Sequence, residues 1–525
     1  MFKIPTNSPS PQIGPNILWL LIPLAVGCTE VQVSDPLADN RLEIAIDSAP
    51  INLDPRIGSD QSSSRVFNLI LNGLVTKDPH GNIVPDLAES WEVLDDGRRY
   101  RFHLRSGVRF HNGKDLRSED VAWTFQSILD NTVISPKKGA LEQVDRVDVV
   151  DPLTVDFVMT EPFGAILVSL TSFLGIVPAG VGSDEFNASP IGTGPFRLVE
   201  RNSDRLVFEA YEGYRDGRPH LDRIVLREVP DSTVRALELK KGSIQLIVGS
   251  LAPDLVAGFR EDPAFKVVAD PGANYAYLGF NLEDPVLGNK KVRRALAHAI
   301  DRQRIVDTLW QGLGTVTETI LPPGHWARNE TLAPIETSIE KARDLLDEAG
   351  YPVPVGTGSR TRFAITYKTS TDETAVLQAQ IIQAMLAEID VSVTIRSNEF
   401  ATFYSDIKQG NFQMFSLVWS GVVDPDILSL VLHSKKIPPL GANRGRYLNL
   451  EFDRLVEAGA RPMDIDLRRP FYLKAQEIFA EELPYISLFH KTNVAVMHAQ
   501  LQGYENYPNG EFLGLRNVRW APSDP

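Results

Sequence analysis

The segment "PDLAESWEVLDDGRRYRFHLRSGVRFHNGKDLRSEDVAWTFQSILD", residues 85–130, changes the period of its apolar residues halfway along. In the first half, Tyr100, Phe102 and Leu104 recur at every second position, directly after the Asp-Asp-Gly sequence of residues 95–97. A period of two beside such turn residues is typical of a β-hairpin. The first half of the segment therefore predicts a hairpin.

The second half of the segment has a helical period. Ser118 is the expected N-cap, and Glu119 and Asp120 suit the positive end of the helix dipole. A second hairpin is expected over residues 144–159, with its turn at residues 151–152. The apolar face of the predicted helix consists of Val121, Phe125, Ile128 and Leu129.

Alternation also predicts a strand at the start of the segment 41–55. A helix should follow over residues 63–75, with Ser63 or Ser64 as its cap and Gly73 near its end. The apolar face of this helix is expected to contain Val66, Phe67, Ile70 and Leu74.

The C-terminal half alternates between the two periods. Strands are expected at 363–367, 391–395 and 412–419, and helices at 373–389 and 400–408. Alternating strands and helices indicate an α/β fold, in which a sheet is covered by helices and ligands bind where strand ends meet a crevice.

The composition of the 525 residues, 43% hydrophobic and 23% charged, is that of a globular protein. This length exceeds what one hydrophobic core usually supports, so two or more lobes are expected. The net charge of −15 argues against a nucleic-acid partner, because such proteins neutralise phosphates with a basic surface.

The chain has one cysteine, Cys28, at the end of an uncharged apolar run that begins at Asn16. This run is too short to span a bilayer but has the length of a signal-peptide core. The sequence "LAVGC" at 24–28 resembles a bacterial lipobox, which implies cleavage after residue 27 and acylation of Cys28. Plain secretion, an uncleaved anchor and a misassigned start are the alternatives. We expect a lipid-anchored protein on the periplasmic side of a bacterial membrane.

Several motifs occur in an order that resembles the family 5 extracellular solute-binding proteins, the peptide- and nickel-binding receptors of ABC importers. The resemblance covers about residues 41–515. Besides the segment quoted first, its motifs are "NLDP" at 52–55, "GTGPF" at 192–196, "YLGFN" at 277–281, "VRRALAHAIDR" at 292–302, Trp419, "DPD" at 424–426 and "NRGRYLN" at 443–449.

This resemblance implies a two-lobed, hinged periplasmic-binding-protein fold of the type II-like class with an inserted subdomain. It implies a monomeric receptor that captures oligopeptides or a related small polar solute and delivers them to a membrane permease with its ATPase. A receptor for a non-peptide solute, or a periplasmic sensor or chaperone, is the alternative. The expected parts are a signal peptide (1–27), a tether (28–40), lobe I (41–60, 192–271 and 485–525), an inserted subdomain of lobe I (61–191) and lobe II (272–484).

The sequence does not favour an enzyme. The segment from Gly107 to Lys114 has one residue too many for a phosphate-binding loop, and Asp115 replaces the hydroxyl residue that would hold magnesium. Neither GxSxG nor HExxH occurs, and the nine histidines are dispersed. A hydrolase would need a nucleophile, and none stands out. We expect no catalytic residue, no cofactor and no bound metal.

The ligand class depends on residues 416–436. In peptide-binding relatives an Asp that follows the Trp neutralises the ligand's α-ammonium group, but the aligned residue here is Val422. Either Asp424 supplies this carboxylate or the ligand has no α-amino group. A nickel receptor is less favoured, since the first histidine of this segment is His433, in a predicted helix, where a packing or surface role is expected.

Aromatic and basic residues complete the expected site. Trp419 could grip a ligand or lie in the core, and Tyr275 and Tyr277, on one side of a strand, could do either. A guanidinium group suits a ligand carboxylate, although surface solvation explains these arginines equally well. The candidate ligand-binding residues are Tyr275, Tyr277, Trp419, Gly421, Asp424, Asn443, Arg444 and Arg446.

Overall fold

A mixed sheet runs through the part of the chain that the computed structural model describes, residues 39–522 without 80, 172, 174, 250, 357–359 and 463. Eleven described strands form this sheet, and β13 (Gly314–Val316) pairs with β17 at its side. The order of the other ten is β15 (Val391–Asn398), β14 (Phe363–Ser370), β16 (Met414–Trp419), β12 (Phe265–Phe280), β17 (Tyr485–His498), β11 (Leu246–Val248), β1 (Arg41–Ile46), β10 (Arg223–Glu228), β9 (Arg205–Ala210) and β8 (Phe196–Arg201).

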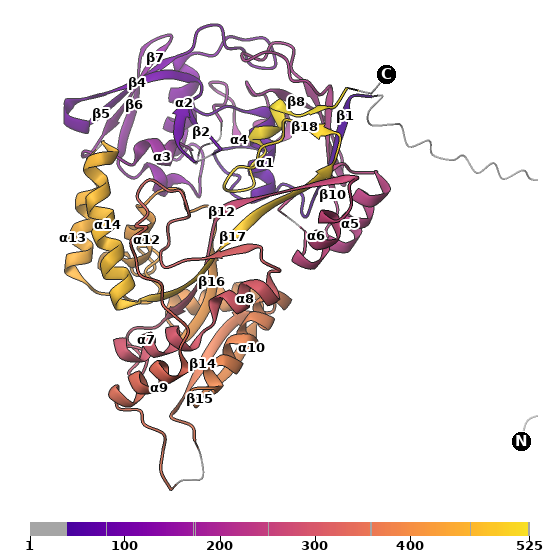
Figure 1. The fold of residues 1–525 in the computed structure, drawn as a ribbon. Coiled ribbons are helices and arrows are strands. Elements are labelled where there is room, and N and C mark those ends of the chain that lie inside the picture. Colours follow the sequence, from indigo (N-terminus) through magenta and orange to yellow (C-terminus); the bar gives the residue numbers. More distant parts are fainter. Residues whose placement is uncertain are drawn as a thin grey trace, which may run out of the picture. The chain divides into compact units, whose positions relative to one another are not determined.

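Two long antiparallel strands connect the two halves of this sheet. β12 has 16 residues and β17 has 14, and they pair along most of their lengths (Figure 1). Residues 265–271 of β12 pair with residues 492–498, and residues 274–279 pair with the first part of β17. The register shifts between these two sections, between Pro271 and Asn274, and shifts again between Ala276 and Tyr277.

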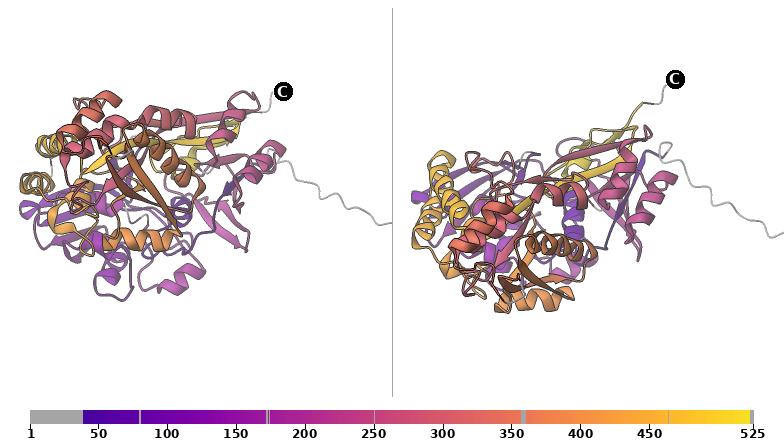
Figure 2. Two further views of the ribbon diagram at one scale, coloured as in Figure 1. Left: turned by 90° about the horizontal axis from the view of Figure 1, so that it is seen from below. Right: turned by 60° about the horizontal axis from the view of Figure 1, so that its bottom comes forward.

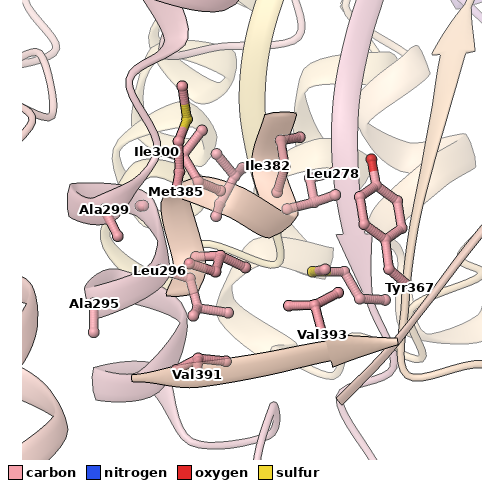
Figure 3. Packing of buried hydrophobic residues seen from close by; sticks show 14 of the residues in the cluster. Leu278, Ala295, Leu296, Ala299, Ile300, Tyr367, Ile382, Met385, Val391 and Val393 are labelled. Atoms are coloured by element: carbon pink, nitrogen blue, oxygen red, sulfur yellow. The ribbon is translucent and has the colours of Figure 1, made fainter. Parts of the chain in front are cut away.

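Helices cover the half of the sheet that contains β14 and β15. α7 (Lys290–Ala299) packs against α9 (Ile339–Glu348), and α10 (Glu373–Ala387) packs on β14 and β15. Figure 2 shows these helices beside the brown strands from two further directions. In Figure 3, buried Leu296, Ile382 and Val393 gather in the interior between α7, α10 and β15. The α/β alternation predicted for residues 363–419 is confirmed.

A separate four-stranded antiparallel sheet is formed by the two predicted hairpins, of which the first lies in the segment 85–130. Its order is β4 (Ala88–Leu94), β5 (Arg99–Leu104), β7 (Thr154–Met159) and β6 (Val144–Asp151), so both predicted hairpins are confirmed. α2 (Ser118–Leu129) packs on it through Val121, Phe125 and Ile128. Two short strand pairs complete the described strands. β2 (Val75–Lys77) pairs with β3 (Ile83–Pro85), and β18 (Leu501–Gln502) pairs with β19 (Arg519–Trp520).

The predicted helix caps are wrong at two helices. α1 begins at Gln61 because Asp60 is its N-cap and accepts a 2.8 Å bond from the Ser63 backbone nitrogen. The helix ends at Ile70, so Leu74 lies beyond it. In α2, Ser118 is already helical, and its hydroxyl donates to the Asp151 carbonyl. An upstream carboxylate outcompetes a serine in the first case, and a tertiary contact recruits the serine in the second.

The remaining helices lie between and after these strands. They are α3 (Ile166–Thr171), α4 (Ser183–Ala188), α5 (Ser232–Lys241), α6 (Pro253–Arg260), α8 (Arg302–Leu309), α11 (Phe400–Gln409), α12 (Ile427–Leu432), α13 (Leu450–Ala460) and α14 (Ile465–Glu482), with 3₁₀ turns at Asp95–Gly97, Lys138–Leu141, Ser434–Lys436 and Leu513–Asn517. In the described part of the chain, none of the helices combines the length and apolarity that crossing a bilayer demands.

Separate hydrophobic clusters fill the different parts of the fold. One lies under the four-stranded sheet, two lie around β1, β10 and β11, and two lie in the half with β14–β16. The expected boundary at 272 falls inside β12, and Ile486 and Leu488, just past the boundary at 485, pack with residues of the expected lobe II. Cys28, the expected signal peptide and most of the tether lie outside the described residues.

Candidate ligand-binding site

The candidate site surrounds the point where the register between β12 and β17 shifts, between Pro271 and Asn274. A Cβ atom on Gly272 would come within 2.4 Å of the Lys491 carbonyl oxygen, a distance that no side chain tolerates. The close passage of the two strands therefore requires glycine at this position. Next to this position in the resulting bulge, the Ala273 carbonyl and the Asn274 side chain each accept a hydrogen bond from the loop after β16.

Two adjoining cavities lie around this bulge. The first has a volume of about 520 Å³ and is lined by the bulge, by residues 322–326 and by residues 504–508. The second has a volume of about 530 Å³ and is lined by the start of α1, by Lys77 of β2, by Asn274 and by residues 509–511. Val423 lines both. Both volumes are in the range of small-molecule sites in proteins.

The loop after β16 closes onto the bulge. The Gly421 nitrogen donates a 3.0 Å hydrogen bond to Asn274 Oδ1, and the Val422 nitrogen donates a 2.9 Å bond to the Ala273 carbonyl. Gly421 has a φ of +68°, and a Cβ atom there would lie 3.2 Å from the Asn509 amide nitrogen. Glycine thus permits both the left-handed backbone and the close approach of this loop to the C-terminal segment.

Buried polar side chains hold the C-terminal loop of residues 504–511 in place through hydrogen bonds. Arg65 donates to the Gly510 carbonyl at 3.2 Å and to the Val248 carbonyl at 2.8 Å. Asn493 of β17 donates to the Tyr507 carbonyl at 2.9 Å. These bonds satisfy loop carbonyls that would otherwise be buried without donors, and they fix the loop as one wall of both cavities.

Two opposite charges line the second cavity without protein partners. Among the described residues, the side chains of Glu511 and Lys77 make no ion pair or hydrogen bond with one another or with any other group. The Oε2 atom of Glu511 is covered, whereas its Oε1 atom keeps accessible surface. Arg65, the third charged residue of this cavity, is already committed to backbone carbonyls.

Trp419 lies in an aromatic stack beside the cavities and lines neither of them. Its ring is parallel to that of Tyr277, with centroids 6.4 Å apart, and the Arg444 guanidinium lies 4.3 Å from the indole centroid. Arg444 also donates 3.0 Å hydrogen bonds to the hydroxyls of Tyr277 and Tyr404. The guanidinium that was expected to bind a ligand carboxylate therefore holds the aromatic stack together.

Tyr275, Asn443 and Arg446 also serve the structure in this arrangement. Tyr275 is fully buried, and its hydroxyl lies 2.7 Å from Ser487 Oγ. Asn443 is buried, and its amide bonds the backbone of its own loop, including the Tyr447 nitrogen at 2.9 Å. Arg446 donates to the Gln409 carbonyl at 3.0 Å. None of the three lines either of these two cavities.

Asp424, the residue expected to supply a carboxylate to the ligand, lines neither cavity. It is buried, lies 3.6 Å from Arg468 Nη2 and accepts a 2.8 Å bond from the Asp426 nitrogen. Burial and then the charge of Asp426 raise the pKa of Asp424 to about 7, against the opposing effect of Arg468. The charged partner of this carboxyl group is therefore the buried Arg468 guanidinium.

The histidines near this site are engaged with the protein. His433 follows the end of α12 instead of lying in a helix, and its Nε2 atom lies 3.0 Å from Glu457 Oε1. His325 lines the first cavity, but its Nε2 atom bonds the Val423 carbonyl at 3.2 Å and its Nδ1 atom accepts from the Ala327 nitrogen at 3.1 Å. In the described part of the chain, no three His, Cys, Asp or Glu side chains are arranged to hold a metal ion.

Of the eight ligand-binding residues predicted from the sequence, Gly421 is the one that lines one of these cavities. The residues predicted from the sequence did not include Lys77, Asn274, Asn509 and Glu511, which line the second cavity. The segment "YENYPNGEF", residues 504–512, carried a signal, because a loop rich in Asn, Pro, Gly and aromatic residues is a common place for binding groups. Lys77 had no local signal at all.

Residues 82–436 match the family model of the bacterial extracellular solute-binding proteins, family 5 (middle region). The heme-binding protein A of Haemophilus influenzae is 32% identical over 88% of this chain and 89% of its own length. The dipeptide-binding protein of Escherichia coli K12 is 27% identical over 94% and 97%. The structure of the oligopeptide-binding protein AppA of Bacillus subtilis in complex with a nonapeptide superposes with a TM-score of 0.75 at 26% identity, covering 92% of this chain and 99% of that one.

The two relatives and the solved structure each match 88–94% of this chain. The α/β periplasmic-binding-protein fold expected from the sequence is confirmed by them. The relatives named above are binding proteins, which agrees with the expectation that the chain is not an enzyme. The protein is therefore a member of the bacterial extracellular solute-binding proteins, family 5.

Proposed function

We propose that this protein is the receptor of an ABC importer and that it captures short peptides in the two adjoining cavities. The observation that carries the proposal is the polar wall of the second cavity, which combines backbone groups, two asparagine amides and one unpaired charge of each sign. A peptide offers matching donors, acceptors and terminal charges. The dipeptide- and nonapeptide-binding relatives support the same ligand class.

A haem-like ligand is the second candidate, because one relative is a heme-binding protein. Haem iron is usually held by a side chain such as histidine. The histidine that lines the first cavity, His325, has both ring nitrogens in hydrogen bonds to the protein. This arrangement favours a peptide, and the experiment below includes haem as a direct competitor.

The ligand class is tested by thermal unfolding of the purified protein with peptides of two to nine residues, free amino acids and haemin. A ligand that binds the folded state alone adds about 2.7 kcal/mol of stability at a concentration 100 times its Kd. We expect peptides to raise Tm in a concentration-dependent way and calorimetry to give a micromolar or lower Kd. If haemin raises Tm and peptides of every length leave it unchanged, the peptide assignment is wrong.

We also propose that binding occurs between two lobes, with the boundaries expected from the sequence: 41–60, 192–271 and 485–525 against 272–484, and 61–191 inserted in the first. The separate hydrophobic clusters and the shift of register between β12 and β17 support this division. A ligand that contacts both sides would favour the closed arrangement. Small-angle scattering with and without peptide should show a smaller radius of gyration in the bound state.

We further propose that acylation of Cys28 keeps the receptor beside its permease on the periplasmic side of the membrane. The lipobox-like "LAVGC" sequence supports this anchor. Stable attachment needs more than one acyl chain, which a bacterial lipoprotein carries. Labelling cells with a palmitate analogue should mark the wild-type protein but not Cys28→Ser, and the variant should appear in the soluble fraction. An unlabelled wild type that stays in the membrane fraction would contradict the anchor.

A further inference from the structure

The loop after Trp419 offers no free carboxylate to the amine of a bound peptide. The family resemblance implies an acidic residue at the place where this sequence has Val422, and the nearby Asp424 lies 3.6 Å from Arg468 and lines neither cavity. An ammonium group that enters a closed cleft without a partner costs several kcal/mol. Another carboxylate must therefore face the ligand if the ligand carries a free amine.

Glu511 is the carboxylate that lines the second cavity. One of its oxygens is covered and accepts no hydrogen bond from the described residues, and the other keeps accessible surface. The charge is thus partly desolvated but still reachable. A carboxylate in this state gains more from an incoming cation than a fully hydrated one, because part of its hydration has already been lost on folding.

Lys77 supplies the opposite charge in the same cavity. It is half-buried, and among the described groups its ammonium has no ion-pair or hydrogen-bond partner. The Lys77 ammonium and the Glu511 carboxylate are not within 4.0 Å of each other, since they form no salt bridge. Two opposite charges that share a cavity without neutralising each other leave room for a ligand that carries both charges.

The backbone around these two residues is fixed in advance. Glu511 follows Gly510, whose carbonyl accepts from Arg65 at 3.2 Å, and precedes Phe512, whose nitrogen donates to Asn68 Oδ1 at 3.0 Å. Lys77 is the last residue of β2, which pairs with β3. Placement on rigid elements reduces the ordering cost when a ligand binds.

We propose that Glu511 and Lys77 form a divided charge pair that recognises a zwitterion, with the ligand's ammonium on Glu511 and its carboxylate on Lys77. This inference rests on the proposed function and deepens it, because it specifies short peptides with both termini free. It also places terminal recognition on β2 and the C-terminal loop instead of on the loop after Trp419.

The test uses one lysine-free short peptide in four forms: free, N-acetylated, C-amidated, and blocked at both ends. Calorimetry measures the Kd of each form for wild type, Glu511→Gln and Lys77→Gln. The matched controls are Glu261→Gln and Lys241→Gln, which make the same charge changes at exposed positions away from both cavities.

Wild type and both controls should bind the free peptide at least tenfold more tightly than either singly blocked form. Glu511→Gln should lose the discrimination against N-acetylation and keep that against C-amidation, and Lys77→Gln should show the reverse. Equal discrimination in wild type and both variants would overturn the proposal, because the two charges would then not contact the termini.

A parallel thermal-shift series with free amino acids and their amides separates this inference from the peptide assignment. If no peptide binds the wild type but amino acids raise its Tm and do not raise that of the two variants, the peptide assignment fails and the charge pair stands. If neither peptides nor amino acids bind the wild type, both fail.

Discussion

Asp424 shows how burial determines the behaviour of a single charged residue. The carboxylates of Asp424 and Asp426 lie 3.6 Å and 3.5 Å from one guanidinium nitrogen of Arg468, so two negative charges share one positive partner. Burial raises the pKa of both carboxyl groups above the ordinary value, and the charge of Asp426 raises that of Asp424 further. The cluster therefore favours holding a proton at mildly acidic pH.

The sign of the pH effect follows from this shift. Between the unfolded value of about 4 and the folded value of about 7, the native state binds a proton at Asp424 that the unfolded state does not. Asp424 thus contributes to stability at low pH, and this contribution is lost as pH rises from 4 to 7. Asp424→Asn removes the titration and keeps an acceptor for the Asp426 nitrogen, which Asp424 now binds at 2.8 Å.

We expect the stability of Asp424→Asn relative to wild type to increase from pH 4 to pH 7, by about 1–3 kcal/mol. Urea unfolding at several pH values measures this difference. Asp344→Asn, at an exposed position, should show almost no such trend. A flat pH dependence for Asp424→Asn would mean that this carboxyl group stays ionised throughout.

At the scale of elements, the position of α1 depends on one capping residue. Asp60 accepts bonds from the Ser63 nitrogen at 2.8 Å and the Ser63 hydroxyl at 2.5 Å. α1 carries Gln61, Ser64 and Arg65, which line the second cavity. The start of this helix therefore affects both the free energy of unfolding and the wall of the second cavity.

Asp60→Ala should lower the free energy of unfolding by about 1 kcal/mol, because a helix nitrogen loses its acceptor. Ser64→Ala is the matched control, since its hydroxyl bonds the Asp60 carbonyl within the first turn but does not cap the helix. Urea denaturation of both variants at one pH checks the difference. Equal stability of Asp60→Ala and wild type would show that water caps the helix as well as Asp60 does.

For the whole molecule, the important feature is the passage of β12 past β17, which joins the two halves of the large sheet. Gly272 allows this passage, because its missing Cβ would lie 2.4 Å from the Lys491 carbonyl oxygen. Any larger side chain must push the strands apart. Such a shift would also move Ala273 and Asn274, which carry the hydrogen bonds to the loop after β16.

Gly272→Ala should therefore destabilise the fold by about 1–3 kcal/mol and weaken ligand binding. Gly258→Ala is the matched control: it lies in α6, where a Cβ atom would meet nothing within 4 Å, and it should be neutral or slightly stabilising. Chemical denaturation and ligand titration measure the two effects. A Gly272→Ala variant as stable as wild type would show that the strands can separate at little cost.

The sequence alone determined the local elements and the family. Apolar periods of two and 3.6 predicted both hairpins of the small sheet, the helix between them and the α/β alternation of residues 363–419, because these periods arise from backbone geometry within one segment. The cap of α1 was missed, since Asp60 and Ser63 compete at the same helix end and the outcome depends on their geometry.

The tertiary structure alone decided which polar residues line the two cavities. Arg444 and Asp424 looked suited to a peptide's termini, but the first is stacked on Trp419 and the second is bound to Arg468. Lys77 and Glu511, which lie near opposite ends of the chain, line one cavity instead. The physical reason is that a charge is available to a ligand only when the fold gives it no partner, and partners come from segments distant in sequence.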